Sequence, residues 1–553
     1  MFRYFLKKRA ANKRAKELLN KKAENRELNA INELEGINTE KQLNHNIAFI
    51  KKILGNSNDI IIHSFIAAYK NIPAAIVYID GLTDKTLINE QILGSLIEDF
   101  RMYEKFEEQK SSIEEVFKYQ LISMTGIKLS NRWTDIILAI LSGDTALLIE
   151  GTDKALVISS RAWEARSIEE PASESTVRGP HEGFTETLRT NTALIRRKIR
   201  DPFLRFDQMT IGLRSQTEVL IAYIEGLANP ELVEEVKKRL SKIKIDRITG
   251  SSEIINLIED NTYSIFPQTI GTERTDMVST GIMDGQVAIF TDNAPFVILV
   301  PCTFQQFLIS SDDYYEHWLY SSLIRLIRTV AIFIVIAGPG LYVCLTAVNP
   351  ELMPTNLLIS TMAGRSGVPF PVIVELMLME FTLELLREAG VRLPKPIGQA
   401  VSIVGALVLG DAAITANVVS PLTVIVVAMT AIASFVIPSY SFGVAIRIAR
   451  FPVTIISSIL GLYGWIMALI FLSVHLVNLK SFNVPYFSPY SPLATGDLRD
   501  NLIIYPLKMR KMRPQYIKSK QLVRSNQDIP LKYKSDEKMK EGLDPNGDDE
   551  STR

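Results

Sequence analysis

TVAIFIVIAGPGLYVCLTAVNP, residues 329–350, contains no charged side chain. A second uncharged stretch covers Pro452–Leu479, and the fifty residues from Ile397 to Ile446 contain a single charge, Asp411. An α-helix needs about 20 consecutive apolar residues to cross a hydrocarbon core of about 30 Å, and each stretch is long enough. The pattern therefore predicts an integral membrane protein.

The bulk composition averages two unlike parts of the chain. The 553 residues carry 61 basic and 61 acidic side chains, 47% of the residues are hydrophobic, and the mean hydropathy is +0.13. The residues before Asp313 and after Arg499 have the polarity of soluble protein, and the apolar stretches lie between them. The predicted fold class is an α/β soluble N-terminal region of two small subdomains, followed by an all-α polytopic membrane domain.

Composition and periodicity divide the chain into five parts. In the soluble region, Ile60–Ile62 and Ala74–Ile79 have the continuous apolar character of buried strands. The predicted parts are a charged helical leader (1–45), two soluble α/β subdomains (46–130 and 131–310), a transmembrane domain (318–479) and a basic, disordered cytoplasmic tail (495–553).

Four crossings are expected in the transmembrane domain, together with embedded broken segments. Gly338-Pro339-Gly340 predicts a kink or break in the first crossing. Arg447 and Arg450 are expected to lie outside the last one. The expected crossings are 323–348, 368–386, the later part of 397–437, and 453–477.

Basic residues gather near both ends of the chain. Met1–Ala30 contains ten Lys or Arg against three acids, and Leu507–Lys540 contains eleven against three. Under the positive-inside rule such segments mark the cytoplasmic side, so both termini are expected in the cytoplasm, with an even number of crossings between them. Each tract is equally compatible with a solvated tail and with binding of anionic lipid headgroups.

The sequence contains no motif of a conventional enzyme. It has two cysteines without a CxxC pair, which supports neither a disulfide framework nor a zinc site. P-loop, GxGxxG and HExxH patterns are absent, and the chain has five histidines. The basic clusters lack the interleaved aromatic residues of a nucleic-acid interface. We therefore expect no enzymatic activity, cofactor, metal or nucleic-acid partner.

Acidic residues occur within the apolar regions. Glu380 and Glu384 are four residues apart on one helix face, Glu375 lies on another face, and Asp411 stands alone. A carboxylate in a bilayer is costly unless it is paired or faces water, so these four residues are candidates for an ion path. In the alternative interpretation, Arg387 neutralises Glu384 at the membrane interface and Asp411 caps a helix.

A helical face of mostly small residues runs through 398–416, with a valine-rich face opposite it. Small residues allow membrane helices to pack closely, which is one interpretation. The other is that several copies of this segment surround a narrow pore whose apolar constriction opens by wetting. The pore or gate candidates are Val401, Val404, Gly405, Val408 and Leu409.

The soluble region contains a charged loop and a basic helix. Gly179-Pro180 marks the loop, and the basic helix ends at Arg200. We interpret these charges as part of an ion-paired interface between subunits. The subunit-contact candidates are Arg178, His181, Glu182, Arg196, Arg197 and Arg274.

Seven runs of the sequence together form a recognisable pattern. In order along the chain they are Arg178–Phe184, Thr190–Arg197, Gly271–Asp276, Glu384–Pro394, Gly410–Ala413, Lys480–Tyr486 and Ser488-Pro489. These runs resemble the A subunits of GerA-type spore germination receptors. The resemblance covers nearly all of residues 46–495, and the sequence departs from the family pattern at His181 and Thr275.

The resemblance implies a multi-pass protein of the inner membrane of dormant spores, with a transporter-like B subunit and a lipoprotein C subunit as partners. It also implies that the A subunit assembles with copies of itself as a ring, a pentamer, and forms a path for monovalent cations. The leading hypothesis is therefore a nutrient-gated cation channel subunit in contact with membrane lipid. A stand-alone secondary transporter and a non-conducting signalling scaffold are the alternatives.

Overall fold

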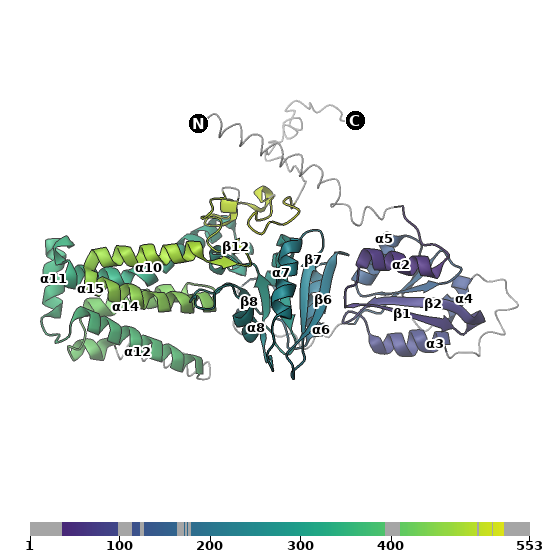
Figure 1. The fold of residues 1–553 in the computed structure, drawn as a ribbon, viewed down its shortest axis with the longest axis horizontal. Helices are drawn as coiled ribbons and strands as arrows, with labels where there is room; N and C mark the ends of the chain where they lie inside the picture. Colours follow the sequence, from purple (N-terminus) through teal and green to yellow (C-terminus); the bar gives the residue numbers. More distant parts are fainter. Residues whose placement is uncertain are drawn as a thin grey trace, which may run out of the picture.

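The computed structural model describes residues 36–97, 113–121, 126–162, 171, 174, 178–392, 410–494, 497–510 and 512–524. Figure 1 shows three bodies in a row: a first β-sheet with its helices, a second β-sheet with its helices, and a bundle of long helices. Most of the predicted leader and the end of the predicted tail lie outside the described residues.

The first body is a five-stranded antiparallel sheet with the strand order β1-β2-β4-β5-β3. Because successive side chains of a strand point to opposite faces, the sheet fills two separate cores. The strands expected at Ile60–Ile62 and Ala74–Ile79 are confirmed as parts of β1 and β2. The strands are β1 (Ile60–Ala67), β2 (Ile72–Ile79), β3 (Ile127–Ser130), β4 (Thr145–Ile149) and β5 (Ala155–Ile158), with the short helix η2 (Tyr69–Asn71) after β1. Helices α2 (Leu43–Leu54) and α5 (Trp133–Leu141) cover one face, and η3 (Leu87–Leu93), α3 (Gly94–Ile97) and α4 (Ile113–Gln120) cover the other.

The second body is also a five-stranded antiparallel sheet, with the order β6-β7-β9-β10-β8. Its strands are β6 (Leu204–Ile211), β7 (Thr217–Ile224), β8 (Ile270–Thr272), β9 (Val287–Thr291) and β10 (Val297–Val300). Helices α6 (Leu188–Lys198) and α9 (Thr275–Asp284) cover one face, and α7 (Pro230–Ser241) and α8 (Ser251–Ile258) cover the other.

The two sheets repeat one topology. In both, a helix and two strands are followed by further helices, an edge strand, another helix and a closing pair of strands, so the two strand orders correspond one to one. The repeat is visible in the sequence, because YIDGLTD at 78–84 and YIEGLAN at 223–229 occupy the same place. Gly81 and Gly226 in these runs have φ angles of 88° and 83°, which glycine adopts without strain. This internal repeat was not predicted.

The repeat corrects the predicted boundary between the two soluble subdomains. We placed the boundary at residue 130, which assigned β4 and β5 to the second subdomain. In the structure β2 pairs with β4 and β5 pairs with β3, so both strands complete the first sheet. The division between the sheets therefore falls after Ile158. The sequences of these short strands did not indicate which strands they pair with, because pairing depends on contacts between residues that are distant in sequence.

The helical bundle begins with α10 (Trp318–Val343), which remains helical through Gly338-Pro339-Gly340 and ends in the wide turn η7 (Cys344–Val348). A Cβ atom at Gly340 would lie 2.8 Å from Ser457 Oγ and 3.2 Å from Trp465, so glycine there allows close helix packing. The other helices are α11 (Thr355–Arg365), α12 (Val372–Arg392), α14 (Pro421–Phe435) and α15 (Tyr440–Asn478), and the short helices are η5 (Phe304–Leu308), η6 (Ser311–Tyr314), η8 (Pro350–Leu352), η9 (Asp497–Asp500) and η10 (Leu507–Met509).

Helix α15 consists of two antiparallel helices joined at Gly461. A straight helix of its 39 residues would be about 58 Å long. However, Phe442 near its start and His475 near its end both contact Phe266, with ring centroids 6.2 and 6.0 Å apart. Trp465 in the second half also returns along α10 and donates a hydrogen bond to Ala337 O at 2.9 Å.

Gly461 makes this reversal with φ 60° and ψ −141°, a combination that side chains rarely permit. A Cβ atom there would lie 2.3 Å from Asn349 Oδ1, which accepts a hydrogen bond from the Leu462 N–H. The single crossing predicted for 453–477 is therefore wrong, because the chain turns back within it. The first arm, 440–460, also contains Arg447 and Arg450, which we had placed outside.

Within the part of the chain that the structure describes, two helical runs are long and apolar enough to cross a membrane: Trp318–Val348, and Tyr440–Asn478, which is the two-armed α15. The other crossings expected in 368–386 and 397–437 stay predictions. Helix α12 nevertheless has reversed polarity, with apolar residues outside and acids inside. Its exposed residues Val374, Leu378, Phe381 and Leu385 recur at helical spacing, whereas Glu375 and Glu380 are buried.

The start of α15 and the hairpin that follows its end both contact the second sheet body. After α15, the hairpin of β11 (Lys480–Ser481) and β12 (Val484–Pro485) enters this body, where Ser481 Oγ accepts from Cys302 N at 3.0 Å and donates to Gln268 O at 2.7 Å. Phe442 at the start of α15 stacks on Phe307 at 5.3 Å. The chain therefore leaves and re-enters the bundle on the same side.

Candidate functional site

The acids of α12 are paired with cations from other helices. Glu375 is 1% exposed and joins three elements. Its Oε1 accepts from Arg365 Nη2 in α11 at 3.0 Å, and its Oε2 accepts from Ser420 N at 2.9 Å and Thr423 Oγ1 in α14 at 3.1 Å. Glu375 is thus a fully bonded carboxylate at the end of the bundle away from the sheets.

Glu380 has a different environment, one turn and a half further along α12. It is fully buried, and its Oε2 lies 3.3 Å from Arg450 Nε in the first arm of α15. Within the described part of the chain, neither oxygen of Glu380 nor Arg450 Nε has a partner at hydrogen-bonding geometry. The contact is therefore an ion pair without aligned hydrogen bonds, and such a pair compensates poorly for the loss of water.

Glu384 lies near the sheet end of α12 and contacts two arginines. Arg387 Nη1 donates to it at 2.8 Å, and Arg447 Nε in α15 donates at 3.2 Å. Its side chain is 38% exposed, in contrast with Glu380. The structure thus places Glu384 in a neutralised, partly exposed network, as the alternative interpretation of this residue anticipated.

The arginines that pair with Glu380 and Glu384 were not recognised from the sequence as their partners. Arg447 and Arg450 are three residues apart and face Glu384 and Glu380, which are four residues apart. Positions three and four apart share a helix face, so matched spacings of opposite charge in apolar segments were the available signal. Pairing with α12 explains how two arginines are buried within an apolar helix.

Asp411 is exposed and lies in a helical run over 410–415. The alternative interpretation of Asp411 as a helix cap is wrong, because Gly410 before it is already helical. Its place in an ion path stays a prediction. The pore or gate candidates Val401, Val404, Gly405, Val408 and Leu409 lie outside the described residues.

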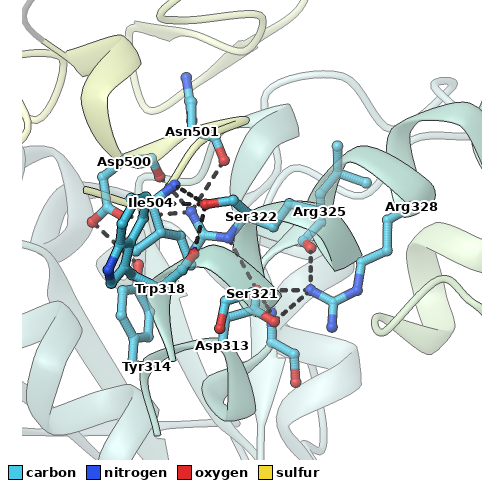
Figure 2. Close-up of polar contacts among 12 residues, drawn as sticks. Asp313, Tyr314, Trp318, Ser321, Ser322, Arg325, Arg328, Asp500, Asn501 and Ile504 are labelled. Atoms are coloured by element: carbon cyan, nitrogen blue, oxygen red, sulfur yellow. Dashed lines mark hydrogen bonds and ion pairs between the residues drawn. The ribbon is translucent and has the colours of Figure 1, made fainter. Parts of the chain in front are cut away.

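A second charge cluster joins the base of α10 to the sheet body (Figure 2). Asp313 in η6 accepts from Arg325 Nε at 3.0 Å and from Arg328 Nη1 at 2.7 Å. Arg328 also donates to Leu308 O at 3.1 Å. Arg325 is 1% and Asp313 5% exposed. Arg325 and Arg328 therefore fix the first turns of α10 to the second body.

The C-terminal segment completes this cluster. Arg325 Nη1 donates to Asp500 O at 2.6 Å and to Asn501 O at 3.0 Å, as Figure 2 shows. Ser322 Oγ in α10 accepts from Ile504 N at 3.0 Å. The guanidinium of Arg325 also lies 5.3 Å from the centre of the Tyr314 ring. The segment after α15 is therefore bonded to the start of α10.

Arg196, predicted as a subunit contact, instead joins the two sheet bodies of one chain. It is fully buried, its Nε donates to Asp59 Oδ2 at 2.6 Å, and its Nη2 donates to Ser57 Oγ at 3.2 Å and Leu204 O at 2.9 Å. An arginine with every bond satisfied inside the chain is not available to a neighbour. The prediction for Arg196 is therefore wrong.

The other subunit-contact candidates fall into two groups. Arg274 is 3% exposed and is paired with Asp276 at 2.7 Å, so it too serves the chain's own fold. Glu182 pairs with Arg197 at 3.4 Å in a half-buried network. Arg178 and His181 are exposed on the loop, where a contact between subunits stays a prediction.

No metal site is visible in the described ranges, because no three His, Cys, Asp or Glu side chains there gather closely enough to hold an ion. What the described geometry contains is a set of buried ion pairs that join helices to one another and to the sheet body. Such pairs can hold an arrangement in place and exchange partners when it changes, but they offer no nucleophile with an activating base.

Comparison with known proteins gives the family. Residues 48–516 match the family described as Bacillus/Clostridium GerA spore germination protein. Spore germination protein KA of Bacillus subtilis (strain 168) is 39% identical over 484 residues, which cover 87% of this chain and 88% of that protein. The uncharacterized membrane protein YfkQ of the same organism is 41% identical over 439 residues, covering 79% and 84%.

The chain is also similar to a solved structure. The crystal structure of the N-terminal domain of the A subunit of the Bacillus megaterium spore germinant receptor GerK3 is 31% identical and covers 48% of this chain and 97% of its own, with a TM-score of 0.38. The family match and the identities over most of both chains are sufficient for assignment. The chain belongs to the GerA family of Bacillus/Clostridium spore germination proteins.

Proposed function

We propose that this protein is the membrane A subunit of a nutrient germinant receptor and that copies of it, arranged as a pentameric ring, form a nutrient-gated cation channel. The receptor resides in the spore inner membrane, surrounded by lipid, with both termini of the subunit in the cytoplasm. Its partners are a transporter-like B subunit and a lipoprotein C subunit. The role is non-enzymatic and needs no cofactor.

The observation that carries this proposal is the buried ion pair of Glu380 and Arg450. The pair joins α12 to α15 at 3.3 Å without aligned hydrogen bonds, in a helix whose outer face is apolar. A poorly compensated intramembrane carboxylate is typical of an ion path or a moving element. The family membership supports the germination context in which such a path would operate.

Gating follows from this arrangement. Nutrient binding to a partner would bias a two-state ring, and α12 would exchange the Glu380–Arg450 contact for water as it moves. The segment 401–409, which follows α12, supplies the apolar constriction that wets in the open state. The sheet bodies, fixed to α10 through Asp313 and to α15 through Ser481, brace the fixed part of the bundle.

A second candidate function is a non-conducting scaffold, and Glu375 favours it. This carboxylate has three hydrogen-bond donors from two other segments, as a purely structural residue would. If Glu380 has the same role, its substitution would alter assembly and leave ion flux unchanged.

The test is potassium leak from growing cells that express the chain with its partner subunits. We expect Leu409→Ser to leak without nutrient at normal membrane levels, because a hydroxyl helps a narrow apolar segment to hydrate. Leu460→Ser, at an outward position that is 52% exposed, is the matched control and should not leak. A well-assembled Leu409→Ser complex that does not leak potassium would favour the scaffold function.

A further inference from the structure

One loop of the second sheet body lies against the end of the helical bundle. It covers residues 259–269, between α8 and the edge strand β8, and Figure 1 shows both elements on the side of this body that faces the bundle. Ser264 Oγ in the loop lies 3.0 Å from His475 Nε2 in the last turn of α15. The ring of Phe266 lies 6.0 Å from the ring of His475. The loop is therefore attached to the end of α15.

The loop has a fixed shape that leaves apolar side chains on its surface. Asn261 N donates to Gln268 Oε1 at 2.9 Å, and Gln268 Nε2 donates to Asn261 O at 2.6 Å. Gln268 is fully buried, whereas Tyr263 is 97% and Ile265 42% exposed. These two residues flank Ser264 in the sequence. The loop therefore presents an aromatic and an aliphatic side chain on both sides of its contact with α15.

The exposed apolar surface of the bundle reaches the level of this loop. Phe471, Val474 and Val477 in the second arm of α15 are all exposed. Val477 follows His475 by two residues, which places it about 3 Å further along the helix axis. A bilayer that covers Val477 therefore extends past the point at which Ser264 contacts the helix. The headgroup layer adds about 5–8 Å beyond the hydrocarbon core on each side, so it reaches the loop.

Other aromatic residues mark the same end of the bundle. Trp318 and Tyr320 in the first turn of α10 are exposed, and so is Tyr440 at the start of α15. Both helix ends contact the second sheet body, so these side chains lie near the same level as Tyr263. Trp and Tyr gather at membrane–water interfaces because each ring is apolar and carries one polar group. Lys480, exposed directly after α15, adds a positive charge that suits anionic headgroups.

We propose that the loop 261–265 is a membrane anchor of the second sheet body, with Tyr263 and Ile265 inserted into the headgroup layer of the bilayer. The inference rests on the proposed membrane location of the bundle, and it makes the lipid surface a binding partner of the soluble region. The Tyr263 ring leaves water for the edge of the acyl chains, while its hydroxyl stays among the headgroups. Together with the bonds of Asp313 and Ser481, the anchor fixes the tilt of the second body relative to the bilayer.

Site-directed spin labelling of the full-length chain, in nanodiscs of phosphatidylethanolamine and phosphatidylglycerol, tests this anchor. A nitroxide is attached to Tyr263→Cys or to Ile265→Cys. Its accessibility to oxygen, which concentrates in lipid, is compared with its accessibility to a nickel chelate, which stays in water. The wild-type chain is the blank, because both of its cysteines are buried.

Two reference positions set the scale of the oxygen-to-nickel ratio. Phe471→Cys, at an exposed position of α15, represents the hydrocarbon core. Leu213→Cys is the matched control for water, because Leu213 is 73% exposed in the hairpin between β6 and β7, at the sheet edge opposite β8. Since the control carries the same nitroxide, it also shows whether the label alone draws an exposed site into lipid.

We expect the ratio at Tyr263→Cys and Ile265→Cys to lie several-fold above that at Leu213→Cys and below that at Phe471→Cys. A ratio equal to that of Leu213→Cys would overturn the proposal, because the loop would then lie in water. Low accessibility to both reagents would also overturn it, because a neighbouring copy or a partner subunit would then cover the loop.

The reference in α15 separates failure of the anchor from failure of the membrane location. If Phe471→Cys gives a high ratio while the loop does not, the anchor is wrong and the bundle still lies in the bilayer. If Phe471→Cys itself gives the ratio of Leu213→Cys, the membrane location is refuted and the anchor with it.

Discussion

The sheet bodies and the helical bundle bury charges in two different ways. In the sheet bodies, Arg196 makes charge-assisted bonds to Asp59 and further bonds to backbone carbonyls, all inside one chain. In the bundle, Arg450 meets Glu380 at 3.3 Å without aligned hydrogen bonds. A fully bonded pair fixes one arrangement, whereas a poorly bonded pair loses little by separating.

This difference indicates a division of labour. The duplicated sheets, with two cores each and a buried arginine between them, form a rigid frame. The bundle is bonded to that frame at the base of α10 and at the end of α15, while α12 is held by its buried acids and by the buried apolar residues Val372, Leu376 and Met379. Movement is therefore expected in α12. The predictions below test this contrast.

The largest effect is expected from breaking the frame at Arg196. Arg196→Leu should lower the free energy of unfolding by about 3–5 kcal/mol, because it leaves Asp59 buried and unpaired. The neighbouring Arg197→Leu removes a half-exposed pair and should change it by less than about 1 kcal/mol. Urea unfolding followed by circular dichroism compares the two variants. Equal losses of unfolding free energy in the two variants would mean that the buried Arg196–Asp59 pair stabilises the protein no more than the half-exposed pair of Arg197.

Next comes the reversal of α15. Gly461→Ala should destabilise the bundle by about 2 kcal/mol or more, because alanine is strained at this φ and ψ and its Cβ collides with Asn349. Gly364→Ala in α11, where a Cβ meets nothing within 4 Å, is the control and should be neutral or slightly stabilising. Thermal unfolding in nanodiscs measures both. A tolerated Gly461→Ala would contradict the hairpin.

The Glu380–Arg450 pair should give an intermediate effect. Glu380→Leu or Arg450→Leu alone should cost about 1–3 kcal/mol, since each leaves one uncompensated buried charge. The double variant should recover most of that loss, because two apolar residues need no compensation. A double-mutant cycle on thermal stability gives the coupling. Additive losses would show that the two residues do not interact.

The smallest effect is expected at the exposed end of α12. Arg392 pairs with Glu388 at 2.7 Å, but both side chains are more than half exposed. Arg392→Ala should therefore change stability by less than about 0.5 kcal/mol. The same thermal unfolding assay detects a larger loss, which would mean that this pair is shielded by a neighbouring chain.

Several elements were predictable from local sequence. Uncharged stretches located α10 and α15, and continuous apolar runs located β1 and β2. The acids of α12 were identified because charge within an apolar helix is visible without a partner. Their partners were not, because Arg447 and Arg450 are more than sixty residues away and only the fold brings them to Glu384 and Glu380.

The turn at Gly461 and the membership of β4 in the first sheet were missed for related reasons. A glycine inside an apolar run is usually compatible with a continuing helix, and its φ and ψ are set by Asn349 from another element. Strand β4 pairs with β2 across a long insertion, so its sheet could not be read from spacing. Comparison of the YIDGLTD and YIEGLAN runs would have indicated the repeat.

The most direct test of the account compares Glu380→Gln with Glu375→Gln for potassium release without nutrient, in receptors assembled with their partner subunits. The account predicts that Glu380→Gln leaks at normal membrane levels, because it frees α12 from Arg450. Glu375→Gln should instead reduce assembly without a leak, because its bonds hold Ser420 and α14 in place. The account would be contradicted if Glu380→Gln complexes released no potassium without nutrient, or if the two variants behaved identically.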